Sequence, residues 1–434
     1  MYDVAIIGGG IIGCATALEL ARRGAQVVVI DRHGAVGHGS TSASCGIVRT
    51  FYSTPTMSAM AHEGRGFWAN WRFYLSAGDD EDLARFERTG MLIVPPAIDA
   101  RINAIIDHMQ EIGVNVEVLT RDELERRFPY LDLRSHQPVR LPGDPDFFEQ
   151  KAGFLDGAIY ERDAGYVVSP LLATENLRRA GEKVGVTFRL GCDVTGITPR
   201  SQPGKPFVLD LAEGAAIEAG AVLNAAGPHS TAVNRLAGVS LPIEIRPLRR
   251  EVHAVTNPDY TDEMGSSVPV VGDIDSGVYF RPESGGRELV VGSLDPECDA
   301  FEWVDDSDDV NVSVTVAGYE RQVMRLMKRY PAVRLAKRRG VAALYDVTLL
   351  DWNPVLDKTD LPGFYVAIGT SGSSFKTAPV IGAVMSELIK ACEGGYDHDR
   401  EPLKLLLPRT GFDLDVGFFS RLRAAHATSA SVLG

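Results

Sequence analysis

Short apolar runs and an amphipathic stretch alternate at the start of the chain. Residues 3–7 (Asp-Val-Ala-Ile-Ile) are almost entirely apolar, which is typical of a parallel strand buried on both faces. Residues 11–21 place apolar side chains on one face of a helix, and the basic pair and glycine at 22–24 are a helix-ending signal. Residues 26–30 form a second buried run. The pattern predicts one β-α-β unit.

Three glycines occupy the turn between the first strand and the helix. Gly8, Gly10 and Gly13 have the G-x-G-x-x-G spacing, and Asp31 ends the second strand 18 residues after the last of them. The first glycine permits the tight turn, the second lets the backbone approach a pyrophosphate, and the third lets helix and strand pack closely. A helix N-terminus binds phosphate, and an acid at this position accepts hydrogen bonds from ribose hydroxyls. The unit predicts a dinucleotide site for NAD or FAD.

The later parts of the chain differ in character. Residues 86–161 mix helical, acidic stretches with proline-rich turns, whereas the runs at 251–255, 277–281 and 288–292 are strand-like and predict an antiparallel sheet. Near the C-terminus, a strand at 363–368 precedes an amphipathic helix that we expect to begin near Phe375. The acidic run at 302–309 is predicted to be a solvated loop and not a metal site.

Composition narrows the class of protein. The 434 residues carry 44 basic and 58 acidic side chains, a net charge of −14, which argues against nucleic acid or an anionic membrane as the main partner. No apolar stretch reaches the roughly 18 residues that a membrane span needs. The five cysteines are scattered, as in a reducing compartment, so a cytoplasmic protein is expected. The H-E-x-x-H, P-loop and G-x-S-x-G motifs are missing, and no metal site is predicted.

Several motifs together resemble those of the D-amino-acid-oxidase-type FAD-dependent oxidoreductases, particularly the sarcosine oxidase and dimethylglycine dehydrogenase branch. They are the N-terminal unit and the segments 39–49, 163–170, 191–197, 222–230 and 369–379. Two of them depart from the family pattern: His229 replaces a tryptophan, and Ser373 and Ser374 replace a His-Gly pair. The resemblance spans nearly the whole chain.

This resemblance implies an α/β fold in which a Rossmann-like FAD-binding domain carries an inserted, largely antiparallel β substrate domain. The FAD-binding domain would comprise residues 1–85, 162–240 and 345–434, and the substrate domain residues 86–161 and 241–344. The residues expected to bind FAD are Gly8, Gly10, Ile11, Ile12, Gly13, Asp31, Arg32, Ser40, Thr41, Cys45, Gly46, Val194, Ala226, Gly227, Gly372, Ser373, Ser374, Phe375 and Lys376.

By resemblance, the activity is oxidation of the C–N bond of an amino acid or N-methyl amino acid to an imine, with hydride transfer to FAD. Two cations, Arg49 and Lys376, would hold the substrate carboxylate. Tyr279, Arg281 and Tyr345 are further candidates for the substrate pocket. The alternatives are a 2-hydroxy-acid or glycerol-phosphate-type dehydrogenase of the same superfamily, and a flavin-bearing subunit of a hetero-oligomer.

Three positions differ from residues with known roles in these relatives. Ala343 and Ala43 stand where the relatives attach their flavin covalently, so FAD is expected to bind non-covalently, although Cys45 and His38 lie nearby in sequence. Val290 stands in place of the lysine that speeds reaction with oxygen in sarcosine oxidase. The electron acceptor is therefore left open between O2, a quinone and an electron-transfer protein. A second G-x-G-x-x-G is missing, so the substrate itself is expected to reduce the flavin.

Overall fold

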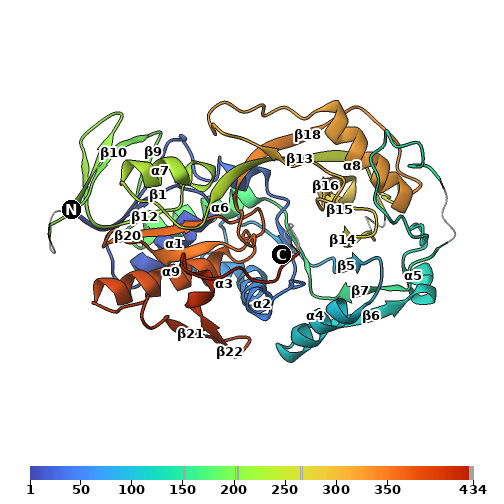
Figure 1. Cartoon of the computed structure of the whole chain (residues 1–434), viewed down its shortest axis with the longest axis horizontal. Helices are drawn as coiled ribbons and strands as arrows, with labels where there is room; N and C mark the ends of the chain where they lie inside the picture. Colours follow the sequence, from blue (N-terminus) through green and yellow to red (C-terminus); the bar gives the residue numbers. More distant parts are fainter. Residues whose placement is uncertain (150–152, 201, 203–204, 264, 266, 430–434) are drawn as a thin grey trace.

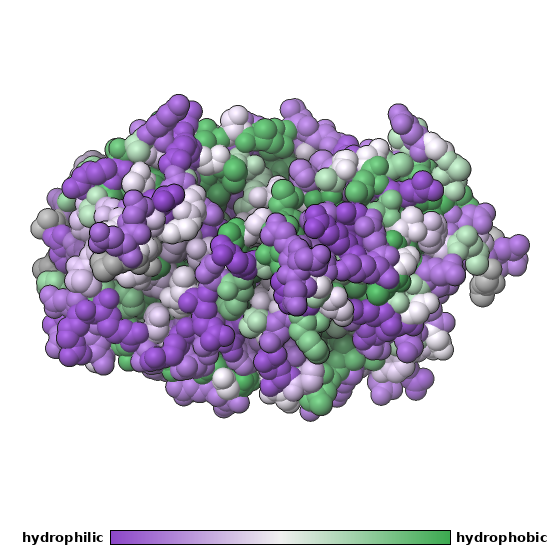
Figure 2. Space-filling view, turned by 180° about the vertical axis from the view of Figure 1, so that it is seen from behind, coloured by the Kyte–Doolittle hydropathy of each residue, from purple (hydrophilic) through white to green (hydrophobic). Residues whose placement is uncertain are grey.

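Two large β-sheets organise the molecule (Figure 1). The computed structural model describes residues 1–149, 153–200, 202, 205–263, 265 and 267–429. Within these residues one sheet has eight strands and the other nine, and two smaller sheets have two and three strands. Hydrophilic residues predominate on the face shown in Figure 2, where hydrophobic residues form separate patches.

The eight-stranded sheet contains the predicted N-terminal unit. Its main path is β10 (Val194–Thr198), β11 (Phe207–Leu211), β12 (Ile217–Asn224), β1 (Tyr2–Ile7), β2 (Val27–Asp31) and β9 (Thr187–Leu190); β20 (Phe364–Ile368) also pairs with β12, and β19 (Val355–Lys358) with β20. The central pairs β12–β1, β1–β2, β2–β9 and β12–β20 are parallel. The carboxyl ends of β1, β2 and β12 therefore lie at one edge, where ligands of such sheets bind.

Helices pack on the eight-stranded sheet through their apolar faces. They are α1 (Ile11–Arg22), α6 (Pro170–Lys183) and α9 (Ala378–Glu393), with α7 (Ser230–Leu236) following β12. Helices α1 and α9 approach closely, because a Cβ on Gly382 would lie only 2.8 Å from the Ala15 carbonyl. The helix expected to begin near Phe375 begins at Ala378, since residues 373–377 form a turn in which the Thr377 amide donates to the Ser374 carbonyl.

The nine-stranded sheet is antiparallel apart from one parallel pair, β5 with β14. Its strands are β17 (Glu302–Trp303), β13 (Ile245–Thr256), β16 (Glu288–Ser293), β15 (Val278–Glu283), β14 (Val270–Asp273), β5 (Met91–Val94), β7 (Gly157–Glu161), β6 (Val116–Thr120) and β18 (Gly340–Thr348). Helix α8 (Val316–Arg329) packs on one face of it. The predicted α/β fold class and the predicted antiparallel sheet are confirmed, whereas the division of the chain into two domains stays a prediction.

The remaining elements complete the arrangement. They are α2 (Pro55–Ala69), α3 (Trp71–Leu75), α4 (Ala100–Glu111), α5 (Arg121–Arg127), the three-stranded sheet of β3 (Ile47–Val48), β8 (Gly165–Val167) and β4 (Phe86–Glu87), and the hairpin of β21 (Lys404–Leu407) and β22 (Phe412–Asp415). The acidic run at 302–309 begins as the two-residue strand β17 and then continues as a loop.

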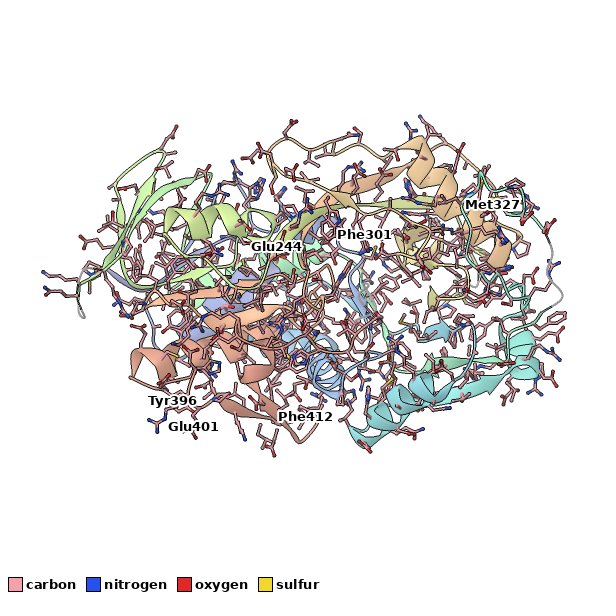
Figure 3. The ribbon with its side chains drawn as sticks, in the orientation of Figure 1. Glu244, Phe301, Met327, Tyr396, Glu401 and Phe412 are labelled. Carbon is pink, nitrogen blue, oxygen red and sulfur yellow. The ribbon has the colours of Figure 1, made fainter. Side chains whose placement is uncertain are left out.

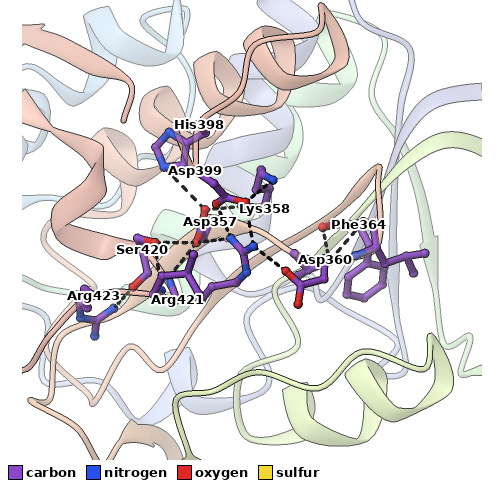
Figure 4. A network of polar contacts seen from close by, with 12 residues as sticks. Asp357, Lys358, Asp360, Phe364, His398, Asp399, Ser420, Arg421 and Arg423 are labelled. Carbon is purple, nitrogen blue, oxygen red and sulfur yellow. Dashed lines mark hydrogen bonds and ion pairs between the residues drawn. The ribbon is translucent and has the colours of Figure 1, made fainter. Parts of the chain in front are cut away.

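A network of ion pairs fastens the segment after β22 to β19 (Figure 4). The Arg421 guanidinium donates to Asp357 at 3.1 Å, to Asp399 at 2.7 Å and to Asp360 at 2.6 Å. Arg421 and Asp357 are buried. Hydrogen bonding from Arg421 holds the pKa of Asp399 well below its usual range; burial opposes this shift, and Lys358 adds to it.

We expect Asp399→Asn to lower the free energy of unfolding by about 1 kcal/mol at pH 7, because a partly exposed charged hydrogen bond is lost. A carboxylate with a depressed pKa stabilises the fold above its unfolded pKa of about 3.9, and this contribution is lost as the pH falls further. Urea unfolding at pH 7 and pH 3 measures the difference, which should shrink at pH 3. The exposed Asp413→Asn variant is the control; an equal loss at both pH values would contradict the prediction.

Candidate active site

A cavity of about 780 Å³ lies at the carboxyl edge of the eight-stranded sheet. We call it the dinucleotide cavity. The residues predicted to bind FAD that line it are Gly8, Gly10, Ile11, Ile12, Asp31, Arg32, Ser40, Thr41, Val194, Ala226, Gly227, Gly372, Ser374 and Phe375. These residues come from widely separated segments of the chain, and the fold gathers them around one space.

The glycine turn leaves room that a side chain would fill. Gly8 has a φ of +114°, and a Cβ there would lie 2.3 Å from the Ala225 carbonyl oxygen. A Cβ on Gly13 would lie 1.9 Å from the Gly8 carbonyl oxygen. Gly10 is the N-cap of α1 and has no side chain with which to cap it. Gly10, Ile11 and Ile12 line the cavity, and the Ile11 amide donates to the Thr41 hydroxyl at 3.2 Å. The positive end of the helix dipole therefore lies at the cavity, which fits the pyrophosphate of a dinucleotide.

Asp31 is fixed at the rim of this cavity by the backbone. One carboxylate oxygen accepts a hydrogen bond from the Gly9 amide at 2.6 Å and the other from the His33 amide at 2.8 Å. A carboxylate has further lone pairs, so Asp31 can still accept hydrogen bonds from ribose hydroxyls. The residues present therefore fit FAD at both the pyrophosphate and the ribose.

A second cavity, of about 280 Å³, adjoins the dinucleotide cavity. We call it the substrate cavity. The two cavities adjoin, because both are lined by Ala43, Ser44, Val341, Tyr345, Gly372 and Phe375. Of the predicted residues, Arg49, Lys376, Tyr279 and Tyr345 line the substrate cavity, as do Cys45 and Gly46, which had been expected to contact the cofactor. Phe301, labelled in Figure 3, also lines it.

Two buried cations line this cavity, and both contact the buried Tyr52. The Arg49 guanidinium lies 4.2 Å from the centre of the Tyr52 ring, and its Nη1 donates to the Phe51 carbonyl. The Lys376 ammonium donates to the Tyr52 hydroxyl at 2.9 Å and to the Ser373 carbonyl at 2.6 Å. Both cations are at most 5% exposed. Arg49 follows β3 and Lys376 precedes α9, so the fold joins residues more than 300 positions apart.

Burial sets the electrostatics of this pair, and the charge of Arg49 adds to its effect on the pKa of Lys376. Burial lowers the pKa of Arg49 and of Lys376, and each favours an added negative charge. Burial alone would raise the pKa of Tyr52, but Lys376 and Arg49 outweigh it and lower that pKa. Nearby, burial raises the pKa of the Glu161 carboxyl, which accepts a hydrogen bond from the Thr50 amide at 2.9 Å. A carboxylate ligand placed between the cations would be held by both.

Tyr279 and Tyr345 provide neutral hydroxyl groups in the same cavity. The Tyr279 hydroxyl lies 3.3 Å from the Cys45 sulfur, and the Tyr345 hydroxyl donates to the Ala43 carbonyl at 3.1 Å. Burial raises the pKa of both phenols, so both remain protonated donors. Gly292 makes room for the first ring, because a Cβ there would lie 2.3 Å from a Tyr279 ring carbon.

Three predicted residues lie outside the cavity linings in the described part of the chain. Gly13 packs beneath the glycine turn, and Ser373 is buried behind the dinucleotide cavity. Arg281 lies over the Tyr166 ring at 4.3 Å, pairs with Glu283 at 2.8 Å and donates from Nε to the Cys45 carbonyl at 2.6 Å. The structure therefore gives Arg281 a position behind the cavity wall.

Sequence reasoning missed Tyr52, which contacts both cations, and several residues of the substrate cavity, Arg250 among them. Tyr52 is three positions after Arg49, a spacing that offers a local signal. Arg250, which pairs with Asp295, has none. Strand β13 pairs with β17 at Arg249 and with β16 from Val252 onward, so its partner changes between these two residues. Beside this change of partner, residues of α8 line the substrate cavity. This part of the cavity depends on the pairing of strands that are distant in the sequence, so a local sequence pattern could not predict it.

The described residues contain no group of three or more His, Cys, Asp or Glu side chains placed to hold a metal ion. None of the helices among them has the length and apolar character that crossing a membrane requires.

Comparison with known proteins gives consistent matches. A family model described as DAO, FAD dependent oxidoreductase, matches residues 3–388. Sarcosine oxidase subunit beta of Rhizobium meliloti (strain 1021) is 25% identical over 398 residues, covering 89% of this chain and 84% of that protein. Glycine oxidase of Geobacillus kaustophilus (strain HTA426) is 24% identical, covering 91% and 95%. The crystal structure of L-proline dehydrogenase from P. horikoshii has a TM-score of 0.73 at 21% identity, covering 96% of each chain.

Proposed function

Because the chain belongs to the DAO family of FAD-dependent oxidoreductases, we propose that it oxidises the C–N bond of an amino acid or N-methyl amino acid to an imine. FAD, when bound, accepts the hydride that leaves the substrate carbon. The names of the relatives, which act on sarcosine and glycine, support a small amino acid as substrate. The shared lining of the two cavities supports substrate oxidation beside the cofactor.

The observation that carries the proposal is the pair of buried cations in the substrate cavity. Arg49 and Lys376 bind the substrate carboxylate, the first through two parallel N–H donors and the second as a point charge. The tyrosines at 279 and 345 donate hydrogen bonds or shape the space beside the substrate. Fixing the carboxylate orients the amine-bearing carbon, and this positioning is the protein's contribution to catalysis.

We further propose that FAD binds without a covalent bond. The residues at 43 and 343 are alanines, whose methyl side chains offer no nucleophile, and both line the dinucleotide cavity. The glycine turn, Asp31 and the residues after β20 then provide the binding contacts. Electrons leave the reduced cofactor to O2, a quinone or an electron-transfer protein.

An anaerobic reduction screen tests the function. The holoprotein is mixed with amino acids, N-methyl amino acids, 2-hydroxy acids and glycerol phosphate, and bleaching of the flavin absorbance is followed with time. We expect amino acids or N-methyl amino acids to bleach it and the other two groups to leave it unchanged. Bleaching by hydroxy acids or glycerol phosphate alone would replace the proposal with a dehydrogenase of alcohols. Failure of every compound would point to a subunit that needs a partner.

A further inference from the structure

The loop between β17 and α8 begins and ends at the nine-stranded sheet and contacts residues that follow strands of the eight-stranded sheet. Residues 304–315, which we call the crossing loop, follow the nine-stranded sheet and reach over β13 and β18 toward α7 (Figure 1). Asp308 and Val312 of this loop line the dinucleotide cavity, although the cavity is otherwise built mainly by the eight-stranded sheet and its loops. The crossing loop thus forms part of the wall of the dinucleotide cavity, although it lies outside the segments that resemble the family motifs.

Asp308 joins two sides of that cavity. One carboxylate oxygen lies 2.6 Å from Nη1 of Arg32, which follows β2, and 3.0 Å from Nε2 of His229, which follows β12. The neighbouring Ser307 hydroxyl donates to the Pro228 carbonyl at 2.8 Å. Both Arg32 and His229 line the cavity themselves. The contacts of the loop therefore span the cavity from the end of one strand to the end of another.

A buried arginine fixes the other end of the loop. Arg249 on β13 donates to the carbonyls of Asn311 and Ser313, each at 2.6 Å. Its remaining nitrogen pairs with Glu251 and Glu302, each at 2.7 Å. Arg249 is 4% exposed, and the loop is therefore anchored firmly at this end. The contacts at Asp308 are more exposed, so they can open while the anchor holds.

We propose that the crossing loop is a strap that closes over FAD and retains it, with Asp308 as the latch. The cavity beneath it fits a dinucleotide, and a strap across its mouth slows escape of a cofactor that has no covalent attachment. His229 supplies one of the two groups that the latch engages, and Arg32 supplies the other. The inference concerns retention of the cofactor and does not depend on which substrate is oxidised.

The release rate of FAD tests the latch. Holoprotein is diluted, and the rise of free-flavin fluorescence is followed for the wild type, Asp308→Ala and the matched control Asp309→Ala, an exposed aspartate of the same loop. We expect Asp308→Ala to release FAD about tenfold faster, as the partly exposed ion pair with Arg32 and the contact with His229 are lost, and the control to stay within about twofold of the wild type. Release of FAD from Asp308→Ala at the wild-type rate would overturn the proposal.

A double-variant comparison and hydrogen exchange separate a latch from a general loss of stability. If Asp308 acts through His229, Asp308→Ala/His229→Ala will release FAD less rapidly than the product of the two single effects predicts. Amides of residues 304–315 should exchange more slowly in the holoprotein than in the apoprotein, since a closed strap is ordered by the cofactor. Fully multiplicative effects, or exchange in this segment that is indifferent to FAD, would each contradict the proposed strap.

Discussion

Lys376→Met is expected to lower kcat/KM for the amino acid selected by the anaerobic screen by about two orders of magnitude. The change keeps an unbranched side chain, one atom shorter, but removes a buried positive charge that donates to Tyr52 and faces the substrate cavity. In the variant, one cation instead of two holds the substrate carboxylate. A charge-assisted hydrogen bond in a desolvated space is lost, and such a bond is worth several kcal/mol at most. Steady-state kinetics on the FAD-loaded variant provides the measurement.

A substrate without the carboxylate distinguishes binding from structural damage. The wild type should prefer the amino acid over its methyl ester, and Lys376→Met should lose most of that preference because the ester never used the cation. Lys390→Met, an exposed lysine at the end of the same helix α9, is the matched control and should behave as the wild type. Equal losses for the acid and the ester would show that Lys376 does not bind the carboxylate.

The pH dependence offers a second readout of the same residue. Burial lowers the pKa of Lys376 below the ordinary lysine value of about 10.4, so its charge is lost at a lower pH than for an exposed lysine. Binding of acetate, an unreactive carboxylate, should therefore weaken as the pH rises toward that value in the wild type. In Lys376→Met this dependence should be reduced, because the titrating group is gone.

The sequence predicted the parts of the site that depend on local pattern. The β1–α1–β2 unit follows from two apolar runs, one amphipathic helix and the glycines between them, and the structure places Gly8, Gly10 and Asp31 around the dinucleotide cavity. Lys376 and Arg49 could be proposed because each lies within a segment that resembles the family motifs. The structure brings both to one cavity.

The rest depends on contacts between distant segments, which no local pattern encodes. Arg281 lies two positions after Tyr279 on the same strand and therefore on the same face of the sheet. Its pairing with Glu283 and its hydrogen bond to the Cys45 carbonyl hold it outside the cavity lining. Cys45 was expected at the cofactor, yet it lies beside the Tyr279 hydroxyl in the substrate cavity. The acidic run that contains Asp308 was interpreted as a solvated loop. Its contacts with Arg32 and His229 arise only when both sheets are in place.

Gly13→Ala is expected to yield a protein that does not retain FAD. The added methyl group would lie 1.9 Å from the Gly8 carbonyl oxygen, a backbone atom that cannot move aside without reshaping the turn. Either helix α1 shifts away from β1 or the turn opens, and both changes displace the amides at the helix N-terminus from the pyrophosphate position. The loss should be severe, because a steric clash with backbone in a fully packed core costs several kcal/mol.

The flavin content of the purified variant, measured as the ratio of visible to ultraviolet absorbance, gives the result directly. Gly34→Ala is the matched control, because a Cβ there meets no atom within 4 Å and its φ lies outside the left-handed region. It should contain as much FAD as the wild type. Circular dichroism shows whether the Gly13→Ala variant is folded. If it is folded and still binds FAD with wild-type affinity, the pyrophosphate does not lie at this turn, and the assignment of the dinucleotide cavity is wrong.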